Sequence, residues 1–296
     1  MNFRILIYFL TVVRERSITK TADMLHITQP TLSRQLMQLE EDLGVKLFDR
    51  SQRKFTLTPA GSFLAQRAAD IVDLVEKTEH DIKDQETNLS GNICFGAGEI
   101  ASVNLLAEII SAFQEKYPNV TFEIFTGTTD IIHYKTEKGL IDIALLQEPI
   151  DMLNYSFLTL PCQEELGILM RKDADLAAKP AISAKDLEGR SLLLPTRLQL
   201  HSLILNWLSG NISKINIIGT CNLLGNAFPL VKHTGCYAIT VRTPLTDSDH
   251  FCFRPLQPPL ITKVFLAWRS SAATNITVQK FIEFSRCFLG IKDASK

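Results

Sequence analysis

The sequence predicts an α plus α/β multidomain protein, with a small helical region first, one long helix next and a larger α/β region last. Three observations predict this order. Two short helical patterns joined by a tight turn lie within residues 17–48, an uninterrupted helical pattern runs from residue 59 to about 89, and strand-like and amphipathic helical segments alternate from residue 92 onwards. A chain of 296 residues is long enough for two or three domains.

The two short helices have start signals and an inward-facing apolar side. Ser17 can cap the first helix and Thr28 the second, and Pro30 suits the first helical position because its missing N–H needs no partner there. We expect the apolar residues of these helices, and of a helix before them, to point inward: Leu6, Phe9, Leu10, Val13, Ala22, Met24, Leu25, Leu32, Leu36, Leu39 and Leu43.

The opposite side of the second helix is mostly polar. Helical spacing places on that side or its flanks Gln29, Pro30, Thr31, Ser33, Arg34, Met37 and Gln38. Arginine can pair bidentately with guanine and glutamine with adenine, while the free N–H groups of a capped helix start, here at Thr28, can contact a phosphate. The pattern indicates a helix that reads a DNA major groove, although an ordinary amphipathic helix with a solvated polar face has the same pattern.

Positive charge is concentrated near the N-terminus. The whole chain has a formal net charge of -1, but residues 1–62 contain nine basic and six acidic residues, a local charge of +3. Three of the basic residues, Arg50, Arg53 and Lys54, lie between two short strand-like pieces, as at the tip of a hairpin. A basic tip beside a groove-reading helix can contact phosphates or enter a narrow minor groove; a solvated turn is the alternative.

These N-terminal features together resemble the winged helix-turn-helix of the LysR-type transcriptional regulators. The matching residues are Ser17, Ala22, Leu25, Gln29, Pro30, Ser33, Leu39, Glu40, Leu43, Gly44, Leu47, Phe48, Arg50, Leu57, Thr58 and Gly61. The resemblance covers the whole chain, more loosely after residue 90. It implies a bacterial regulator that binds promoter DNA in a sequence-specific way and is modulated by a small molecule in a cleft between two α/β lobes.

The resemblance also implies a domain plan and a set of DNA-binding residues. We expect a winged helix-turn-helix at 1–58, a dimerising linker helix at 59–90 and an effector-binding domain at 91–296, similar to periplasmic binding proteins, with lobe I at about 91–161 plus 266–296 and lobe II at about 162–265. The expected DNA-binding residues are Thr28, Gln29, Pro30, Thr31, Ser33, Arg34, Gln38, Arg50, Arg53 and Lys54.

The long helix has the spacing of a coiled-coil seam. Residues three and four apart are apolar or small along one stripe, comprising Leu64, Ala68, Ile71, Val75, Thr78 and Ile82. Its other faces are acidic, which would keep them away from DNA. In the family this helix pairs two chains, so we expect a homodimer or a dimer of dimers, with RNA polymerase as a further partner if the protein is an activator.

The α/β region predicts a ligand site at the carboxyl ends of its strands, where helix starts present free N–H groups. The residues expected there are Gly98, Glu99, Ile100, Ser102, Thr128, Thr129, Gln147, Thr196, His201 and Asn222. Many family members that bind small anions carry Ser or Thr where this chain has Gly98 and Ile100, and a carboxylate at Glu99 would repel an anion. We also expect Tyr237 to reshape the far wall. The resulting hypothesis is an effector that is neutral, amine-bearing or larger, rather than a simple small carboxylate.

Two other classes of protein fit less of the chain. A solute-binding protein for transport would explain two α/β lobes but not the helix-turn-helix, and it needs a cleavable signal; the apolar run after Arg4 is not followed by a small-x-small cleavage site and is too short to span a bilayer. An enzyme would need a phosphate loop, a GxSxG motif or metal-spaced His and Cys residues. The six histidines and six cysteines are dispersed instead.

We therefore expect a cytoplasmic protein with no catalytic residues, no cofactor, no metal and no membrane association. The cysteines are expected to be small buried residues. Some family members sense oxidants through a cysteine pair in the region that here holds Cys221 and Cys236, but neither has a basic neighbourhood in the sequence that would activate it.

Overall fold

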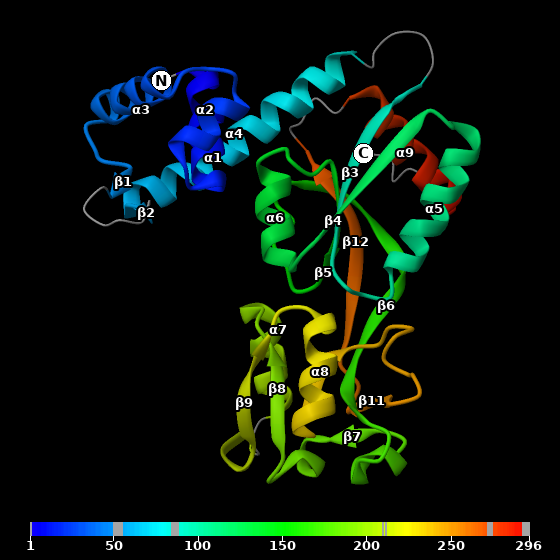
Figure 1. The fold of residues 1–296 in the computed structure, drawn as a ribbon. Coiled ribbons are helices and arrows are strands. Elements are labelled where there is room, and N and C mark those ends of the chain that lie inside the picture. Colours follow the sequence, from blue (N-terminus) through cyan, green and yellow to red (C-terminus); the bar gives the residue numbers. More distant parts are fainter. Residues whose placement is uncertain are drawn as a thin grey trace. The chain divides into compact units, whose positions relative to one another are not determined.

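The computed structural model of the chain describes residues 2–49, 56–83, 89–208, 210, 212–270 and 275–291. It contains two compact units, Met1–Lys83 and Asp84–Lys296 (Figure 1). The long helix belongs to the first unit. Within the described residues, no helix is long and apolar enough to cross a membrane.

The first unit is a helix-turn-helix followed by a two-stranded hairpin and the long helix. Its elements are α1 Phe3–Glu15, α2 Ile18–Met24, α3 Gln29–Leu43, β1 Phe48–Asp49, β2 Thr56–Leu57 and α4 Pro59–Lys83. The hairpin is antiparallel, with Phe48 opposite Leu57 and Asp49 opposite Thr56. The predicted elements are therefore present, and α4 begins at the predicted residue.

The predicted caps are formed. The hydroxyl of Ser17 accepts a hydrogen bond from the N–H of Lys20 at 3.3 Å, and that of Thr28 accepts one from the N–H of Thr31 at 3.4 Å. Helix α3 starts at Gln29, so Pro30 is its second residue rather than its first. Gly44, with φ of 68°, ends α3 in the left-handed conformation that favours glycine.

The core of the first unit joins all its helices to the hairpin. Its fully buried apolar residues are Ile5, Leu6, Phe9, Val12, Ala22, Leu32, Leu36, Leu39, Leu47, Phe48 and Ala68. Two residues predicted to point inward do not: Met24 is 48% exposed and Leu43 is 38% exposed. Each is the last residue of its helix, where the chain turns away before a neighbouring element can cover the side chain.

Two residues of the predicted seam along α4 pack within their own unit. Ala68 is fully buried and Leu64 is partly buried beside it, so Ala68 has no surface left for a second chain. The spacing identified a buried face correctly, but that face packs on the same chain. Exposed apolar side chains lie along one edge of this stripe, with the predicted Ile71 at 40% exposed and its neighbours on the helix surface, Phe63 and Leu74, at 63% and 42%. Val75 is half-buried and Thr78 exposed, and the side chain of Ile82 lies outside the described part of the structure.

A buried carboxylate fixes the hairpin to α3. Glu40 accepts hydrogen bonds from the N–H groups of Leu47 at 2.8 Å and Phe48 at 3.2 Å, and pairs with the ammonium of Lys46 at 3.1 Å. Burial by itself raises the pKa of the Glu40 carboxyl. The two N–H groups and the ammonium outweigh burial, so the pKa lies below its ordinary value.

The second unit contains two α/β lobes that share long strands. The strands are β3 Gly91–Ala97, β4 Val120–Thr126, β5 Ile143–Gln147, β6 Tyr155–Arg171, β7 Ile182–Ser183, β8 Ser191–Pro195, β9 Asn216–Cys221, β10 Tyr237–Val241, β11 Phe251–Gln257 and β12 Ile261–Arg269. The helices are α5 Val103–Lys116, α6 Thr129–Glu137, α7 Leu198–Trp207, α8 Leu224–Thr234 and α9 Ile276–Phe288, with 3-10 turns at Asp175–Ala178, Ala184–Leu187 and Ile212–Lys214.

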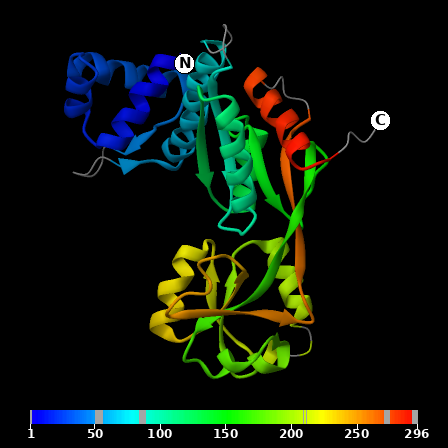
Figure 2. The same cartoon turned by 90° about the vertical axis from the view of Figure 1, so that its right-hand side faces the viewer.

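The strand order explains how the lobes are joined. It runs β4-β3-β5-β12-β6-β10-β8-β9, so β6 belongs to the sheets of both lobes. This strand is 17 residues long, and β12 pairs with it from Tyr155 opposite Arg269 to Glu165 opposite Ile261. Figure 2 shows β6 and β12 passing together from one lobe to the other.

Helices cover both faces of each sheet, as expected for parallel sheets. In lobe I, α5 and α9 pack on one face and α6 on the other (Figure 1). In lobe II, α7 packs on one face and α8 on the other. The predicted succession of strands and helices is confirmed, whereas β7 and β11 had not been predicted. β7 is only two residues long, and Pro255 interrupts the strand pattern of β11.

We predict that Gly61→Ala destabilises the first unit. An added Cβ at Gly61 would lie 2.1 Å from the carbonyl oxygen of Leu47, so the start of α4 could not pack on the hairpin. Overpacking of this kind costs about 1–3 kcal/mol. Thermal unfolding of the full-length protein, followed by circular dichroism, should show a lower first transition. Gly98→Ala is the control, because its Cβ would make only ordinary contacts, at 3.6 Å or more. Unfolding of G61A at the wild-type temperature would contradict this packing.

We also predict a pH-dependent effect of Glu40→Gln. The pKa of Glu40 lies below its ordinary value of 4.5, so its stabilising contribution is fully present above that pH and is lost as the pH falls through the lowered pKa. At about pH 7 the substitution should lower the free energy of unfolding by about 1–3 kcal/mol, because buried N–H groups lose their charged acceptor. The deficit should shrink on acidification. Glu41→Gln, an exposed neighbour, should have little effect; a deficit of E40Q that did not vary with pH would disprove the role of the charge.

Candidate functional site

The outward face of α3 is exposed as predicted. Thr28, Gln29, Pro30, Thr31, Arg34, Met37 and Gln38 are exposed, and Ser33 is half-buried. The amide of Gln29 donates to the hydroxyl of Ser33 at 2.8 Å, which fixes the direction of both side chains. Gln38 donates to Asp42 at 3.1 Å.

Arg34 lies between these restrained side chains and is itself unrestrained. Within the described residues its guanidinium makes no hydrogen bond and no ion pair. An exposed guanidinium at the centre of a helix face keeps its full set of donors for a ligand. The predicted wing residues Arg50, Arg53 and Lys54 lie outside the described residues.

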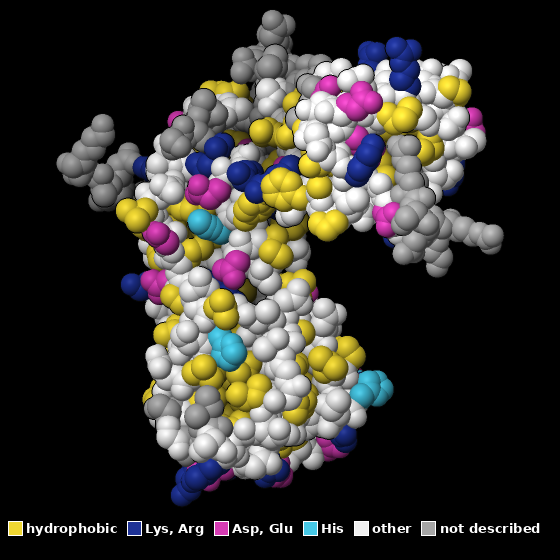
Figure 3. Space-filling view, turned by 90° about the vertical axis from the view of Figure 1, so that its left-hand side faces the viewer, with side chains coloured by type: hydrophobic (Ala, Val, Ile, Leu, Met, Phe, Trp, Pro, Cys, Tyr) yellow, Lys and Arg dark blue, Asp and Glu magenta, His cyan; other side chains and the backbone are white. Residues whose placement is uncertain are grey.

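The surface charge is mixed rather than uniformly positive. On the face shown in Figure 3, Lys and Arg side chains lie scattered among Asp and Glu side chains. The net charge of the chain, -1, agrees with this distribution. Any attraction for a polyanion must therefore come from a local group of basic residues and not from the field of the whole protein.

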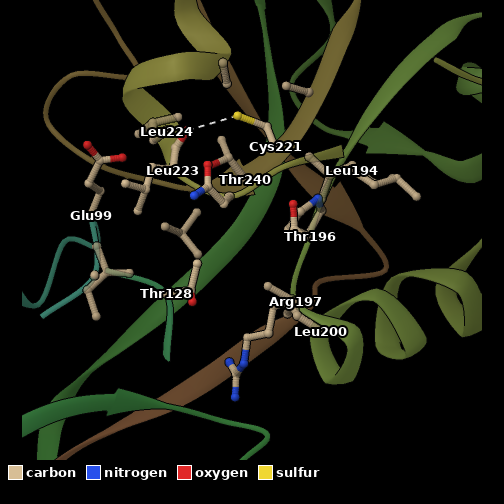
Figure 4. A pocket seen from close by; sticks show the side chains of 18 of the residues that line it. Glu99, Thr128, Leu194, Thr196, Arg197, Leu200, Cys221, Leu223, Leu224 and Thr240 are labelled. Atoms are coloured by element: carbon tan, nitrogen blue, oxygen red, sulfur yellow. Dashed lines mark hydrogen bonds between the residues drawn. The ribbon is translucent and has the colours of Figure 1, made fainter. Parts of the chain in front are cut away.

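A cavity of about 110 Å³ lies between the two lobes of the second unit, at the carboxyl ends of their strands (Figure 4). Its wall contains eight of the ten predicted effector-binding residues: Gly98, Glu99, Ile100, Thr128, Thr129, Gln147, Thr196 and Asn222. Much of the remaining wall is aliphatic, with Leu166, Leu193, Leu194, Leu200, Leu223, Leu224, Ile239 and Val241. The general rule for ligand sites on α/β sheets placed the cavity correctly.

Two predicted residues do not line the cavity. Ser102 is buried, and both its hydroxyl and its N–H donate to the carboxylate of Glu164, which also accepts from the N–H of Ala101 at 3.2 Å. His201 lies on α7, one residue after Leu200, which does reach the cavity. Ser102 lies just before α5 and His201 within α7, and the directions of their side chains depend on packing.

Arg197 was missed by the sequence analysis. It lines the cavity, is only 7% exposed and reaches from lobe II to lobe I, where it donates to the carbonyl oxygens of Glu148 and Pro149. Its Nε lies 3.7 Å from a carboxylate oxygen of Asp130. Burial lowers the pKa of Arg197, and the charge of Asp130 offsets part of this effect. One feature of the sequence could have identified Arg197: it directly follows Thr196, at the carboxyl end of the strand β8.

Glu99 joins the lobes from the other side. It follows β3 in lobe I, and its Oε2 accepts a hydrogen bond at 3.0 Å from the N–H of Gly225, the second residue of α8 in lobe II. A Cβ at position 225 would lie 3.2 Å from the other carboxylate oxygen, so glycine permits this close approach. The carboxylate thus occupies the positive end of the α8 dipole.

Tyr237 does not form the far wall of the cavity, contrary to expectation. It is buried in the core of lobe II, and its hydroxyl donates to Asp175 at 2.6 Å. Burial, and then the bond to Asp175, raise the pKa of Tyr237 to about 12. Its ring lies at the start of β10, on the same face as Ile239 and Val241, which do line the cavity.

The cysteines are only partly as expected. Cys94, Cys236 and Cys252 are buried, Cys162 and Cys221 are half-buried, and Cys287 is exposed. Cys221 lines the cavity, and its thiol donates to the carbonyl of Leu223 at 3.1 Å. Among the described residues there is no group of three or more His, Cys, Asp or Glu that could hold a metal ion.

Comparisons with known proteins find similar proteins for both units. The model of the bacterial regulatory helix-turn-helix proteins of the lysR family matches residues 3–62, and that of the LysR substrate binding domain matches residues 86–289. The chain is 32% identical to the HTH-type transcriptional regulator BsdA of Bacillus subtilis over 214 residues, which is 69% of this chain and 73% of BsdA.

Another relative is the probable RuBisCO transcriptional regulator of Gracilaria tenuistipitata var. liui. The identity is 29% over 196 residues, or 65% of this chain, and the match spans 63% of the length of that relative. The probable RuBisCO transcriptional regulator of Porphyra purpurea is 28% identical to this chain over 196 residues, and the match spans 62% of the length of that relative.

Solved structures share the fold over nearly the whole chain. The LysR family transcriptional regulator CbnR gives a TM-score of 0.75 at 19% identity, covering 99% of this chain and 100% of CbnR. The structure of full-length CbnR complexed with its target DNA gives a TM-score of 0.74 at 18% identity. The match covers 97% of this chain and 99% of that CbnR chain. The two family models cover both units and most of the chain. This chain therefore belongs to the LysR family of bacterial helix-turn-helix transcriptional regulators.

Proposed function

We propose that this protein binds promoter DNA in a sequence-specific way through the exposed face of α3, in the bacterial cytoplasm. The observation that carries the proposal is Arg34, an exposed guanidinium without a partner in the described structure, flanked by Gln29 and Ser33 in fixed directions. A rigid helix with one unengaged arginine suits bidentate recognition of guanine. Phosphate contacts from basic residues, including those of the predicted wing, would supply affinity that falls with salt.

We propose further that a small molecule in the interlobe cavity modulates this binding. The cavity lies where Glu99 and Arg197 connect the lobes, so a ligand there contacts both lobes at once. A ligand that binds one arrangement of the lobes better than another shifts their equilibrium by its difference in affinity. The protein has no catalytic role in this proposal, and no cofactor is required.

The proposed assembly is a homodimer, or a dimer of dimers, formed through α4. A revised stripe supports it, because Phe63, Ile71 and Leu74 are exposed apolar side chains on one helix, whereas Ala68 is buried. Apolar side chains that recur at helical spacing on an exposed face are typical of a helix that packs on a partner. Contact with RNA polymerase would apply if the protein activates transcription.

We predict that Arg34→Ala relaxes base preference at one position in each half-site, at a cost of about 1–3 kcal/mol. The measurement is retention and sequencing of fragmented genomic DNA by the full-length protein. Arg34→Lys is the matched variant, because it keeps the charge but loses the bidentate geometry. If Arg34 reads a base, R34K should lose specificity as R34A does. If R34K behaves as wild type and R34A weakens binding to every sequence equally, Arg34 contacts phosphate instead.

We predict that Leu74→Asp shifts the protein toward monomers at micromolar concentration. A charge on the apolar stripe would have to be desolvated in a paired helix, which is unfavourable. Sedimentation of the full-length protein measures the effect. Asp73→Ser is the control, since Asp73 is an exposed neighbour already compatible with the assembly. An unchanged assembly of L74D would remove this stripe from the interface.

A further inference from the structure

The wall of the cavity between the lobes has few charged side chains. Among the described residues that line it, Glu99 is the only acid and Arg197 the only base. The guanidinium of Arg197 is already engaged, since it donates to two carbonyl oxygens and lies beside the carboxylate of Asp130. Asp130 thus offsets part of the charge of this side chain, while its buried Nε has no hydrogen-bond partner in the described structure.

Three of the helix starts around the cavity carry a carboxylate of the chain, whereas α7, which begins directly after Arg197, has no acidic residue in its first turn. Glu164 accepts the N–H groups of Ala101 and Ser102 at the start of α5, at 3.2 and 2.8 Å. Asp130 lies in the first turn of α6, and Glu99 binds the start of α8. A carboxylate at a helix start cancels the positive end of the dipole, which is the feature that would attract an external anion.

Hydrogen-bond acceptors, by contrast, remain open toward the cavity. Within the described residues the Oε1 atom of Glu99 accepts no hydrogen bond, since Oε2 alone is bonded to Gly225. The amide nitrogen of Gln147 donates one of its two N–H groups to Thr262 at 2.7 Å, which leaves its carbonyl oxygen and the other N–H without a partner in the described structure. The hydroxyl of Thr128 makes no capping bond. An ammonium group brings three donors and a positive charge to such a set.

The size and the remaining wall limit the ligand further. At about 110 Å³ the cavity is far smaller than the roughly 300–1,000 Å³ of a drug-sized site. Figure 4 shows Glu99 beside Leu223 and Leu224, with Arg197 at the opposite side of the view. A ligand that uses Glu99 therefore has aliphatic side chains next to its charged end.

We propose that the cavity binds a small aliphatic primary amine in its cationic form, with the ammonium group donating to Oε1 of Glu99. This inference rests on the proposed function, because it names the chemical class of the effector for that same site. The ammonium pairs with the carboxylate that already joins lobe I to α8, and the alkyl part packs on Leu223 and Leu224. Glu99 is thus the residue that selects cations over anions.

The test compares two probes of nearly equal size, n-propylamine and propionate, by calorimetric titration of the full-length protein without DNA. We expect propylamine to bind and propionate to bind at least about tenfold more weakly, as the loss of a charge-assisted hydrogen bond would require. Propionate binding as tightly as propylamine, or no binding of either probe, would overturn the proposal.

Variants show whether Glu99 carries the selectivity. Glu99→Gln keeps the shape but removes the charge, and it should lower the affinity for propylamine by about tenfold or more. Glu123→Gln is the matched control, because it makes the same charge change at an exposed position of β4 that does not line the cavity. Equal affinities of E99Q and wild type would overturn the assignment.

The two proposals fail separately. Amine binding is measured without DNA, and retention of genomic DNA is measured without amine. A protein that retains specific DNA but shows no preference for the amine refutes the effector class alone. A protein that binds the amine through Glu99 but retains no specific DNA refutes the regulator proposal and leaves the cation selectivity of the cavity supported.

Discussion

The effector cleft depends on one buried carboxylate, that of Glu164. It lies on β6, the strand shared by both lobes, and it accepts the N–H groups that begin α5. Without it, buried donors would lose their acceptor, which is costly because a buried N–H group has no water to replace the bond. The same contact fixes the segment that carries Gly98 and Glu99. This interaction thus positions one wall of the cavity. It also occupies the N–H groups at the start of α5, which therefore cannot bind an external anion.

Carboxylates play a similar structural role elsewhere in the chain. Glu40 ties the hairpin to α3 by accepting two N–H groups, so the direction of the recognition helix relative to the hairpin is set by a buried charge. Glu99 connects the lobes in the same way. In each case a backbone N–H group that no local partner satisfies receives a charged acceptor from a distant part of the chain.

Much of the fold follows from local spacing. Caps at Ser17 and Thr28, the glycine at the end of α3 and the alternation of strands and helices after residue 92 are all readable because each depends on residues within a few positions of one another. The exposed face of α3 follows from the same periodicity. The errors have a common cause. Periodicity shows that Ala68 is buried but not what buries it, and it does not reveal that helix ends such as Met24 and Leu43 remain uncovered.

The sequence by itself determined the family, the order of elements, the exposed residues of α3 and the strand ends that surround the cavity. The tertiary structure decided which side chains at those strand ends face the cavity. Ser102 turns away to meet Glu164, which is 62 residues further along the chain, and Glu99 bonds Gly225 across 126 residues. Arg197 likewise reaches carbonyl groups about 50 residues earlier in the chain. Such contacts satisfy buried polar groups between distant segments, and no local pattern of residues encodes which segments will meet.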